Sequence, residues 1–401
     1  MPPNSNTFYQ YLGLHSLLIG IFPFYIPVYL WKQGFDVSDI SIFIALSSVG
    51  FCLALWVWDR LRLLIDLTTL IGLSLVLEVV LLLNVHALEM NFQILLLLGL
   101  TYGAYNCFYW TTQRALFFDL IDLKSSGRKY GNFQIFVGGS LQVGILIGGL
   151  LLEKTNFIYL LAVSTMIAVA GFFLVTHRKP LYPKTLMEHT SLKLKDVVRF
   201  KDQEKSKLIF VIDGIFLFAE SFFWVITLFL IAHESFAKLG VMVLSLAIVF
   251  GVLFFMLKNV IDRLGKKRVY ILAVYLYALS WGLRALTDDQ LPLELLYVSL
   301  VLVTFCTTFF RLAMNKRFYD LAKLTCSHDY LVLKSYYTQF AIIFAFGIFG
   351  IWTYQTEANE ALLIPIYWGC AVLSLVYLAY GAKRYRYVSQ AMPSSGVTET
   401  R

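Results

Sequence analysis

Long apolar runs recur along the whole sequence, and they restrict the fold more than any other feature. Each run holds about 18 to 25 mostly apolar residues, enough for a helix to cross roughly 30 Å of hydrocarbon. The runs are continuous rather than alternating in polarity, which argues against a membrane β-barrel. Hydrophobic residues make up 59% of the 401 residues, and charged residues only 14%. The sequence therefore predicts an all-α integral membrane protein.

Twelve such runs can be counted, and each is expected to be a transmembrane helix. They divide into two six-helix bundles, residues 1–176 and 208–387, joined by a basic linker at 177–207 and followed by a flexible tail at 388–401. No cleavage site follows the first run, so this run is expected to stay as the first helix. The predicted spans are 11–31, 41–58, 64–86, 92–113, 132–152, 157–176, 208–232, 239–257, 269–286, 293–313, 336–354 and 361–382.

Basic residues gather on one side of the predicted helices. Of the 33 Lys and Arg residues, 29 lie on the side that holds both termini, and only Lys32, Lys154, Lys238 and Arg284 lie on the other. Because basic residues near helix ends resist translocation, both termini are expected in the cytoplasm, with the protein in a plasma or inner membrane. The net charge of +8 then lies on the side that faces anionic membrane lipids. Contact with these lipids is enough to explain the basic charge, so nucleic-acid binding is not implied.

The sequence offers no pattern for a cofactor or a metal. Its five cysteines are scattered without a CxxC pair or metal-ligand spacing, and no phosphate-binding loop or ATP-binding domain is found. We therefore expect no cofactor and no metal, and we expect a monomer. A lipid-modifying enzyme would need a cluster of His, Asp or nucleophilic residues near one interface, and no such cluster is evident.

Two acidic motifs occur at the same point of each half, which indicates an internal duplication. Asp59 and Asp262 lie about 200 residues apart, each followed by arginine, and Asp119 and Asp320 show nearly the same offset. The segment "DRLGKKR" at 262–268 resembles the G-x-x-x-D-R-x-G-R/K-R/K signature of the major facilitator superfamily (MFS) of secondary transporters. The segment Gly127–Gly149 resembles the loop between the fourth and fifth helices and the glycine-rich fifth helix of that family. The first copy of the signature keeps Asp59 and Arg60 but lacks the glycine and the basic pair.

The resemblance implies two pseudo-symmetric bundles that rock about a central site, and a charged gate on the cytoplasmic side. Plain membrane anchoring explains Lys266, Lys267 and Arg268 more simply, but an acidic residue adds nothing to anchoring. The residues expected to form the gate are Asp59, Arg60, Asp119, Arg128, Asp262, Arg263 and Asp320.

Polar stripes along four helices predict a central cavity. A charged side chain in the membrane core costs about 2.5 to 3.5 kcal/mol, so polar side chains there usually face inward. The stripes lie on the first, fourth, seventh and tenth helices, which line the cavity in the family that the sequence resembles. The residues expected to line it are His15, Tyr25, Tyr102, Asn106, Tyr109, Gln113, Trp224, Thr304, Thr308 and Arg311. Some of the tyrosines fit an interfacial aromatic belt equally well.

Two carboxylates of the seventh helix are candidates for proton coupling. Asp213 and Glu220 are two helical turns apart and share a face. Burial disfavours a charged carboxylate, so Glu220, near the middle of its helix, is the first candidate for proton exchange. A protonated carboxyl group hydrogen-bonded across a helix interface is the alternative. Glu78, on the third helix, fits that alternative better.

These features together predict a secondary transporter that moves a small solute by alternating access, with proton coupling left open. Aromatic residues make up 16% of the chain and are frequent on the fourth and seventh helices, which favours an amphiphilic or aromatic organic solute. A cationic group near Asp213 or Glu220 is also compatible. The alternatives are a non-transporting membrane sensor or scaffold with the same fold and, less favoured, a membrane enzyme.

Overall fold

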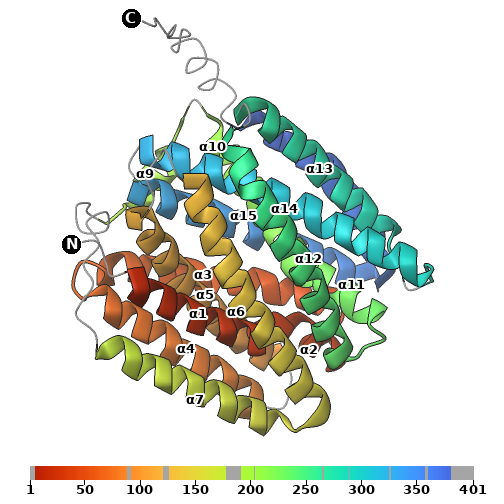
Figure 1. Cartoon of the computed structure of the whole chain (residues 1–401). Helices are drawn as coiled ribbons and strands as arrows, with labels where there is room; N and C mark the ends of the chain where they lie inside the picture. The colour runs from red at the N-terminus through yellow and green to blue at the C-terminus, as the bar shows by residue number, and fades with distance from the viewer. Residues whose placement is uncertain are drawn as a thin grey trace, which may run out of the picture.

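The structure, a computed structural model, describes residues 5–87, 92–120, 126–177, 191–202, 204–263, 266–288, 290–324, 327–356 and 360–380. Within these ranges the regular elements are all helical. In Figure 1 the red-to-yellow helices of the N-terminal half gather in the lower part and the green-to-blue helices of the C-terminal half in the upper part. The predicted all-α fold with two helical halves is confirmed.

The N-terminal half begins with a bent helical rod. Pro23 and Pro27 lack a backbone N–H, and the helix is interrupted there by one short 3-10 turn. The elements of this half are α1 (Ser5–Ile21), η1 (Pro23–Tyr25), α2 (Ile26–Lys32), α3 (Val37–Leu61), α4 (Leu67–Ala87), α5 (Phe92–Leu120), α6 (Ser126–Lys154) and α7 (Phe157–Thr176). The linker contributes α9 (Leu194–Arg199).

The C-terminal half also begins with an interrupted rod, which contains one π-helical turn at Ala219–Phe223. Its elements are α10 (Ser206–Phe218), η2 (Ala219–Phe223), α11 (Trp224–Ile231), α12 (Phe236–Arg263), α13 (Lys266–Leu286), α14 (Leu293–Leu324), α15 (Ser327–Thr356), η3 (Glu360–Leu362), α16 (Leu363–Leu373) and η4 (Ser374–Ala379).

The predicted number of membrane crossings is confirmed only in part. Among the described residues, nine helical stretches are long and apolar enough to cross a membrane. Two shorter apolar helices, Phe236–Val249 and Leu363–Ala379, fall at the predicted eighth and twelfth spans. The predicted fourth span lies on α5, which is helical throughout. The helix order thus follows the predicted order, although fewer than twelve stretches meet the criteria for a span.

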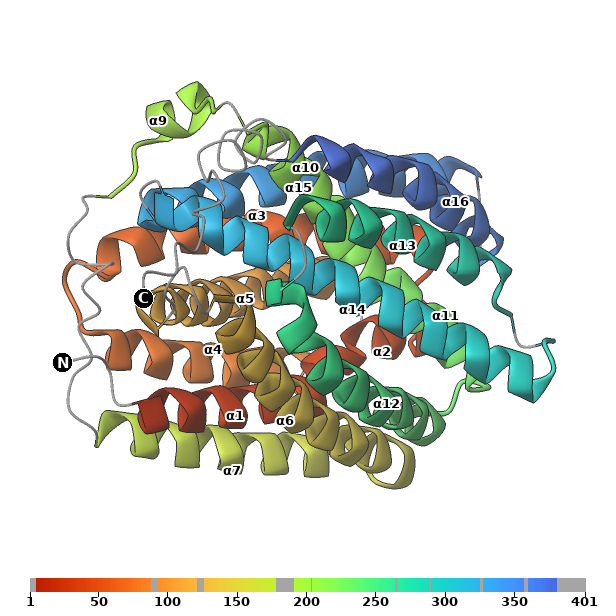
Figure 2. The same cartoon turned by 45° about the horizontal axis from the view of Figure 1, so that its top comes forward.

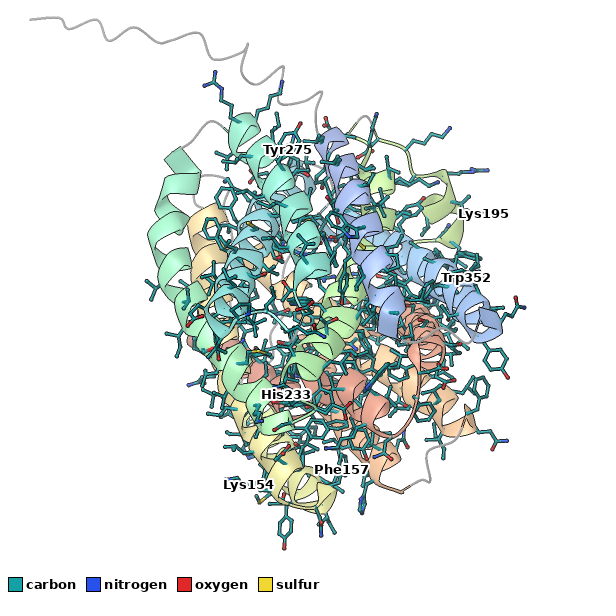
Figure 3. The ribbon with its side chains drawn as sticks, turned by 90° about the vertical axis from the view of Figure 1, so that its right-hand side faces the viewer. Lys154, Phe157, Lys195, His233, Tyr275 and Trp352 are labelled. Carbon is teal, nitrogen blue, oxygen red and sulfur yellow. The ribbon has the colours of Figure 1, made fainter. Side chains whose placement is uncertain are left out.

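The helices of both halves run between the same two ends of the molecule, which we call the linker side and the far side. The linker side holds α9, and the far side holds the turn between α11 and α12. Figure 2 shows most helices running between these two sides, with α9 at the upper left. In Figure 3, Lys195 of α9 lies in the upper part, and Lys154 and His233 lie in the lower part. The two halves pack against each other through α6 with α12 and through α3 with α15.

Close helix crossings inside the N-terminal half depend on glycine. A Cβ atom at Gly103 of α5 would overlap the carbonyl oxygen of Ser47 and lie 2.6 Å from the amide nitrogen of Phe51, both on α3. Gly144 and Gly148 of α6 meet the backbone of α1 in the same way. Small residues allow such contact between backbones in a membrane, where no hydrophobic force drives helices together. These crossings hold α1 against α6 and α3 against α5.

Candidate functional site

A cavity of about 490 Å³ lies between the two halves, and residues from both halves line it. Its volume is within the range of small-molecule sites. The lining residues come from α1, η1, α3, α5 and α6 on one side and from α10, η2, α11, α14 and α15 on the other. They are Ile19, Pro23, Phe24, Phe51, Tyr102, Asn106, Trp110, Gln113, Arg114, Phe133, Leu141, Asp213, Leu217, Phe218, Glu220, Ser221, Val225, Arg311, Asn315, Tyr319, Lys334, Ser335, Thr338 and Gln339.

Arg311 is the centre of a charged network on the C-terminal wall of the cavity. Its Nη1 atom donates to Asp213 Oδ1 at 2.7 Å, and its Nη2 and Nε atoms donate to Glu220 Oε2 at 2.8 and 3.1 Å. The planar guanidinium group bridges two carboxylates, an arrangement that a lysine ammonium group matches poorly. Because α14 extends to Leu324, Arg311 lies well inside the helix rather than at its end. Three of the ionisable residues that the sequence places in the membrane, Asp213, Glu220 and Arg311, are thus in direct contact.

Three further groups complete this network. Lys334 of α15 places its Nζ atom 3.0 Å from Asp213 Oδ2. The hydroxyl of Tyr377 donates to Asp213 Oδ1 at 3.0 Å, and the hydroxyl of Tyr277 donates to Glu220 Oε1 at 2.7 Å. Both carboxylates therefore have cationic and neutral donors around them, as buried charges require. The role of Asp213 and Glu220 in proton coupling stays a prediction.

The cavity lining carries more positive than negative charge. The cations are Arg114, Arg311 and Lys334, and the anions are Asp213 and Glu220. Both anions are engaged by Arg311 and Lys334. Arg114, on the opposite wall, makes no ion pair with any of the described side chains. A cation without a described partner in the wall of a cavity attracts an anionic or electron-rich group.

Some of the predicted cavity residues do line the cavity. Tyr102, Asn106 and Gln113 of α5 line it together with Arg311, and the two proposed coupling residues also face it. On α5 the neighbouring Trp110, which the sequence analysis did not single out, donates from Nε1 to Asn106 Oδ1 at 3.1 Å. Tyr102, Asn106 and Trp110 are spaced four residues apart and lie on one helical face, so helix periodicity would have predicted Trp110 as a cavity residue.

The other predicted cavity residues are not among those that line it. His15 and Tyr109 are buried in the N-terminal half, where their rings lie 4.1 Å apart. Tyr25 donates to the carbonyl oxygen of Ile145 at 2.6 Å. The ring of Trp224 packs against Tyr367 and beneath the guanidinium group of Arg284. Thr304 is half-buried and bonds back to the Leu300 carbonyl, and Thr308 is half-buried on the same helix.

The two halves are in contact on the far side. Ser38 of α3 donates to the carbonyl oxygen of Gly350 on α15 at 2.7 Å, and Glu153 of α6 accepts from the backbone N–H of Phe236 at 3.0 Å. A Cβ at Gly149 of α6 would lie 2.6 Å from the Phe236 carbonyl oxygen, so α6 and the start of α12 approach closely. About three turns nearer the linker side on the same face of α6, a Cβ at Gly138 would meet no described atom within 4 Å. Among the described side chains, close contact between α6 and α12 is therefore seen on the far side.

On the linker side, Asp59 joins three separate parts of the chain. Its Oδ1 atom lies 2.8 Å from Arg62 Nε and 3.0 Å from His328 Nε2 of α15, and its Oδ2 accepts from the backbone N–H of Leu192 in the linker at 2.8 Å. The other ring nitrogen of His328 lies 3.0 Å from Asp329 Oδ1. Since carboxylates only accept, both ring nitrogens donate, and the ring is an imidazolium. His328 was missed from the sequence because nothing near it indicates this partner.

Two other predicted gate residues, Arg60 and Asp320, contact residues of their own helices. Arg60 donates to the carbonyl oxygen of Trp56 on its own helix at 2.8 Å and stacks on the Trp56 ring. Asp320 lies near the end of α14, with its Oδ2 atom 3.7 Å from Lys316 Nζ. The side chains of Asp119, Arg128, Asp262 and Arg263 lie outside the described residues, so these predictions stay open.

Asp59→Asn is expected to weaken the contact between the halves on the linker side. An asparagine has one neutral carbonyl oxygen in place of two charged oxygens, so Arg62 and His328 lose the carboxylate that both contact. Removing one partner of a buried ion pair typically costs about 3–5 kcal/mol. We expect a lower Tm in detergent and faster maleimide labelling of a cysteine introduced at Asn315 in the cavity.

Arg60→Gln is the matched control, because Arg60 is adjacent in sequence but, among the described residues, bonds only within its own helix. Equal Tm and labelling rates in the two variants would contradict a role of Asp59 in holding the halves together.

The Major Facilitator Superfamily profile matches residues 12–324. The chain belongs to this superfamily. As an MFS protein it falls in a class of secondary transporters, which favours transport over catalysis. A comparison of the sequence with curated proteins finds no match.

Solved MFS structures have the same fold over nearly the whole chain. The nucleoside transporter NupG is 15% identical, with a TM-score of 0.66 over 93% of this chain and 98% of that one. A mutant of NupG is 13% identical, with a TM-score of 0.68 over the same shares of the two chains. At such low identity these likenesses concern the fold alone. The predicted fold class and family are confirmed.

Proposed function

We propose that this MFS protein is a secondary transporter for a small organic solute that carries a ring and an anionic or electron-rich group. The observation that carries the proposal is the cavity itself, which lies between the two halves and is lined by both. A site at the interface of two similar bundles can open to either side when the bundles rock. The distribution of basic residues supports the linker side as the cytoplasmic side.

Aromatic side chains support a ring-bearing solute. Phe24, Tyr102 and Trp110 line one wall, and Phe218 and Tyr319 line the other. Between them lie amide and hydroxyl groups that can bond a polar substituent. A nucleoside, the solute named for NupG, also has a ring and polar substituents. We therefore include a nucleoside among the solutes to test.

The charge balance favours an anionic group over a cationic one. A cation near Asp213 or Glu220 would compete with Arg311 and Lys334, which already engage both carboxylates. An anion would instead pair with Arg114, which no described side chain neutralises. From the sequence alone, a cationic group near these acids is also compatible, and the ion pairs in the structure favour an anionic group instead.

A matched series of indoles tests the proposal. Indoleacetate, indoleacetamide and tryptamine share one ring system and are anionic, neutral and cationic. We expect indoleacetate to raise the Tm of the purified protein most, with uridine as the nucleoside comparison. Arg114→Gln is expected to weaken indoleacetate binding about tenfold, since a charge-assisted hydrogen bond is lost.

Flux of the best ligand into proteoliposomes then separates a transporter from a sensor or scaffold. Binding without flux in either direction would contradict transport. A larger Tm shift with tryptamine than with indoleacetate would contradict the charge preference.

A further inference from the structure

A second group of ionisable side chains lies in the N-terminal half, outside the cavity. His15 of α1, Glu78 of α4 and Tyr109 of α5 are fully buried, and Tyr105 of α5 is 1% exposed. His15 Nδ1 lies 3.8 Å from Glu78 Oε2, and the His15 ring packs against both tyrosine rings. None of the four residues lines the cavity. Ionisable groups at this depth in a membrane protein usually have a function.

Hydrogen bonds determine which nitrogen of His15 carries the proton. The hydroxyl of Ser74 donates its only hydrogen to the carbonyl oxygen of Ile71 at 2.7 Å. His15 Nε2, which lies 2.8 Å from the same hydroxyl oxygen, must therefore be the donor in that contact. In the neutral ring the other nitrogen, Nδ1, then carries a lone pair, and this lone pair lies on the side of Glu78.

None of the described residues donates a hydrogen bond that would stabilise a negative charge on Glu78. Neither of its carboxyl oxygens accepts a hydrogen bond from any of the described residues. An ionised carboxylate buried without donors is costly, and the group takes up a proton instead. Glu78 Oε2 and His15 Nδ1 are 3.8 Å apart, which is too far for a hydrogen bond in this conformation. A small side-chain movement would join them.

We propose that Glu78 and His15 form a proton-binding site that holds one proton in this conformation and releases it in another. Release requires a donor for the carboxylate, and Tyr105 supplies a candidate. Its hydroxyl makes no hydrogen bond with the described residues and is close enough to Glu78 for an electrostatic interaction. The other titratable groups that face the pair are Tyr11 of α1 and Tyr109 of α5. The side chains of α6 that touch α1 nearby, Phe136 and Ser140, are uncharged.

Helix α5 connects this proton site to the cavity. Trp110 lines the cavity on one face of the helix, and its ring meets the ring of Tyr109 at 4.7 Å. Tyr109 in turn packs against His15. A solute that displaces Trp110 would therefore move the rings around the proton site. Contiguous packed side chains of this kind are a physical route for coupling, provided that they have two arrangements.

The coupling of this proton to solute movement rests on the proposed transport function, whereas proton binding itself does not. Infrared spectroscopy of the purified protein tests binding directly. We expect a neutral carboxyl C=O band at pH 7 that shifts in deuterated water, disappears in Glu78→Gln and persists in Glu220→Gln. His15→Gln is expected to move the band rather than remove it. An unchanged band in Glu78→Gln, or no neutral carboxyl band in the wild-type protein, would overturn the proton site.

Proteoliposomes loaded with a pH-sensitive dye test the coupling. With an indoleacetate gradient, we expect wild-type protein to move protons with the solute. Glu78→Gln is expected to lose solute-driven proton movement but to keep indoleacetate counterflow, which needs no net proton transfer. Proton movement in Glu78→Gln equal to wild type would overturn the coupling. If indoleacetate shows no flux in wild-type protein, the transport proposal fails for this probe, and the infrared result still decides the proton site.

Discussion

Arg311→Gln is expected to slow transport strongly while the protein still folds. Arg311 is the only residue seen to contact both Asp213 and Glu220 among the described side chains. Without it, Asp213 keeps Lys334, but Glu220 keeps only the hydroxyl of Tyr277. Asp213 and Glu220 then both line the cavity, and the negative charge of Glu220 has lost its arginine partner. Solute entry would have to overcome this repulsion, because the solute that we propose is itself anionic.

The expected magnitude follows from the geometry. Removing one partner of a buried ion pair costs about 3–5 kcal/mol, and partial exposure to the cavity favours the lower value. The Arg311 side chain is 21% exposed. We expect the unpaired charge to raise the barrier to solute entry by a similar amount, and about 3 kcal/mol corresponds to roughly a 100-fold fall in transport rate. Flux of the solute identified in the thermal-shift series is the measurement.

Two further variants separate charge from geometry. Arg311→Lys keeps the positive charge but replaces the planar group that bridges both carboxylates, so we expect an intermediate rate. The double variant Arg311→Gln with Glu220→Gln removes one charge of each sign and is expected to recover Tm but not flux. Flux in Arg311→Gln above half of the wild-type rate would show that the network is not required for transport.

Gly103→Ala is expected to prevent folding of the N-terminal half, although alanine is the smallest possible addition to glycine. The added Cβ would overlap the carbonyl oxygen of Ser47 on α3, and a backbone atom cannot move aside as a flexible side chain can. The two helices would have to separate along their crossing. We expect little monodisperse protein by size-exclusion chromatography in detergent.

Gly139→Ala of α6 is the matched control, because a Cβ there would meet no described atom within 4 Å. The same substitution in an open helical position stabilises by about 0.4–1 kcal/mol, since the unfolded chain loses freedom. We expect Gly139→Ala to give a Tm equal to or above that of the wild-type protein. Equal yields of the two alanine variants would show that α3 and α5 do not cross as closely as described.

The sequence predicted most of the helix order and part of the cavity wall. Tyr102, Asn106 and Gln113 follow one helical face, and helix geometry alone brings them to the same wall. The high cost of ions in a membrane identified Asp213, Glu220 and Arg311 as special, but it did not show that they bind one another. Their pairing depends on how α10 and α14 pack, which local sequence does not contain.

The residues that the sequence analysis missed have partners far away along the chain. The predicted span begins at residue 336, which leaves Lys334 outside the helix. The structure starts α15 at Ser327, so Lys334 lies inside the helix, and Asp213 neutralises it. His328 lies against Asp59, which is 269 residues away in sequence. Only the packing of α3 on α15 reveals that contact.

The π-helical turn at Ala219–Phe223 gives the chain one residue more than a regular helix would need there. Such a turn absorbs an inserted residue locally, so that α10 and α11 keep the faces that they present to their neighbours. Deleting Ser221 would restore a regular turn and leave Thr227 beside Tyr367, whose hydroxyl groups are 2.6 Å apart. The Glu220 carboxyl group, however, would turn away from Arg311. Deleting this one residue would therefore give a stable protein in which Glu220 no longer contacts Arg311.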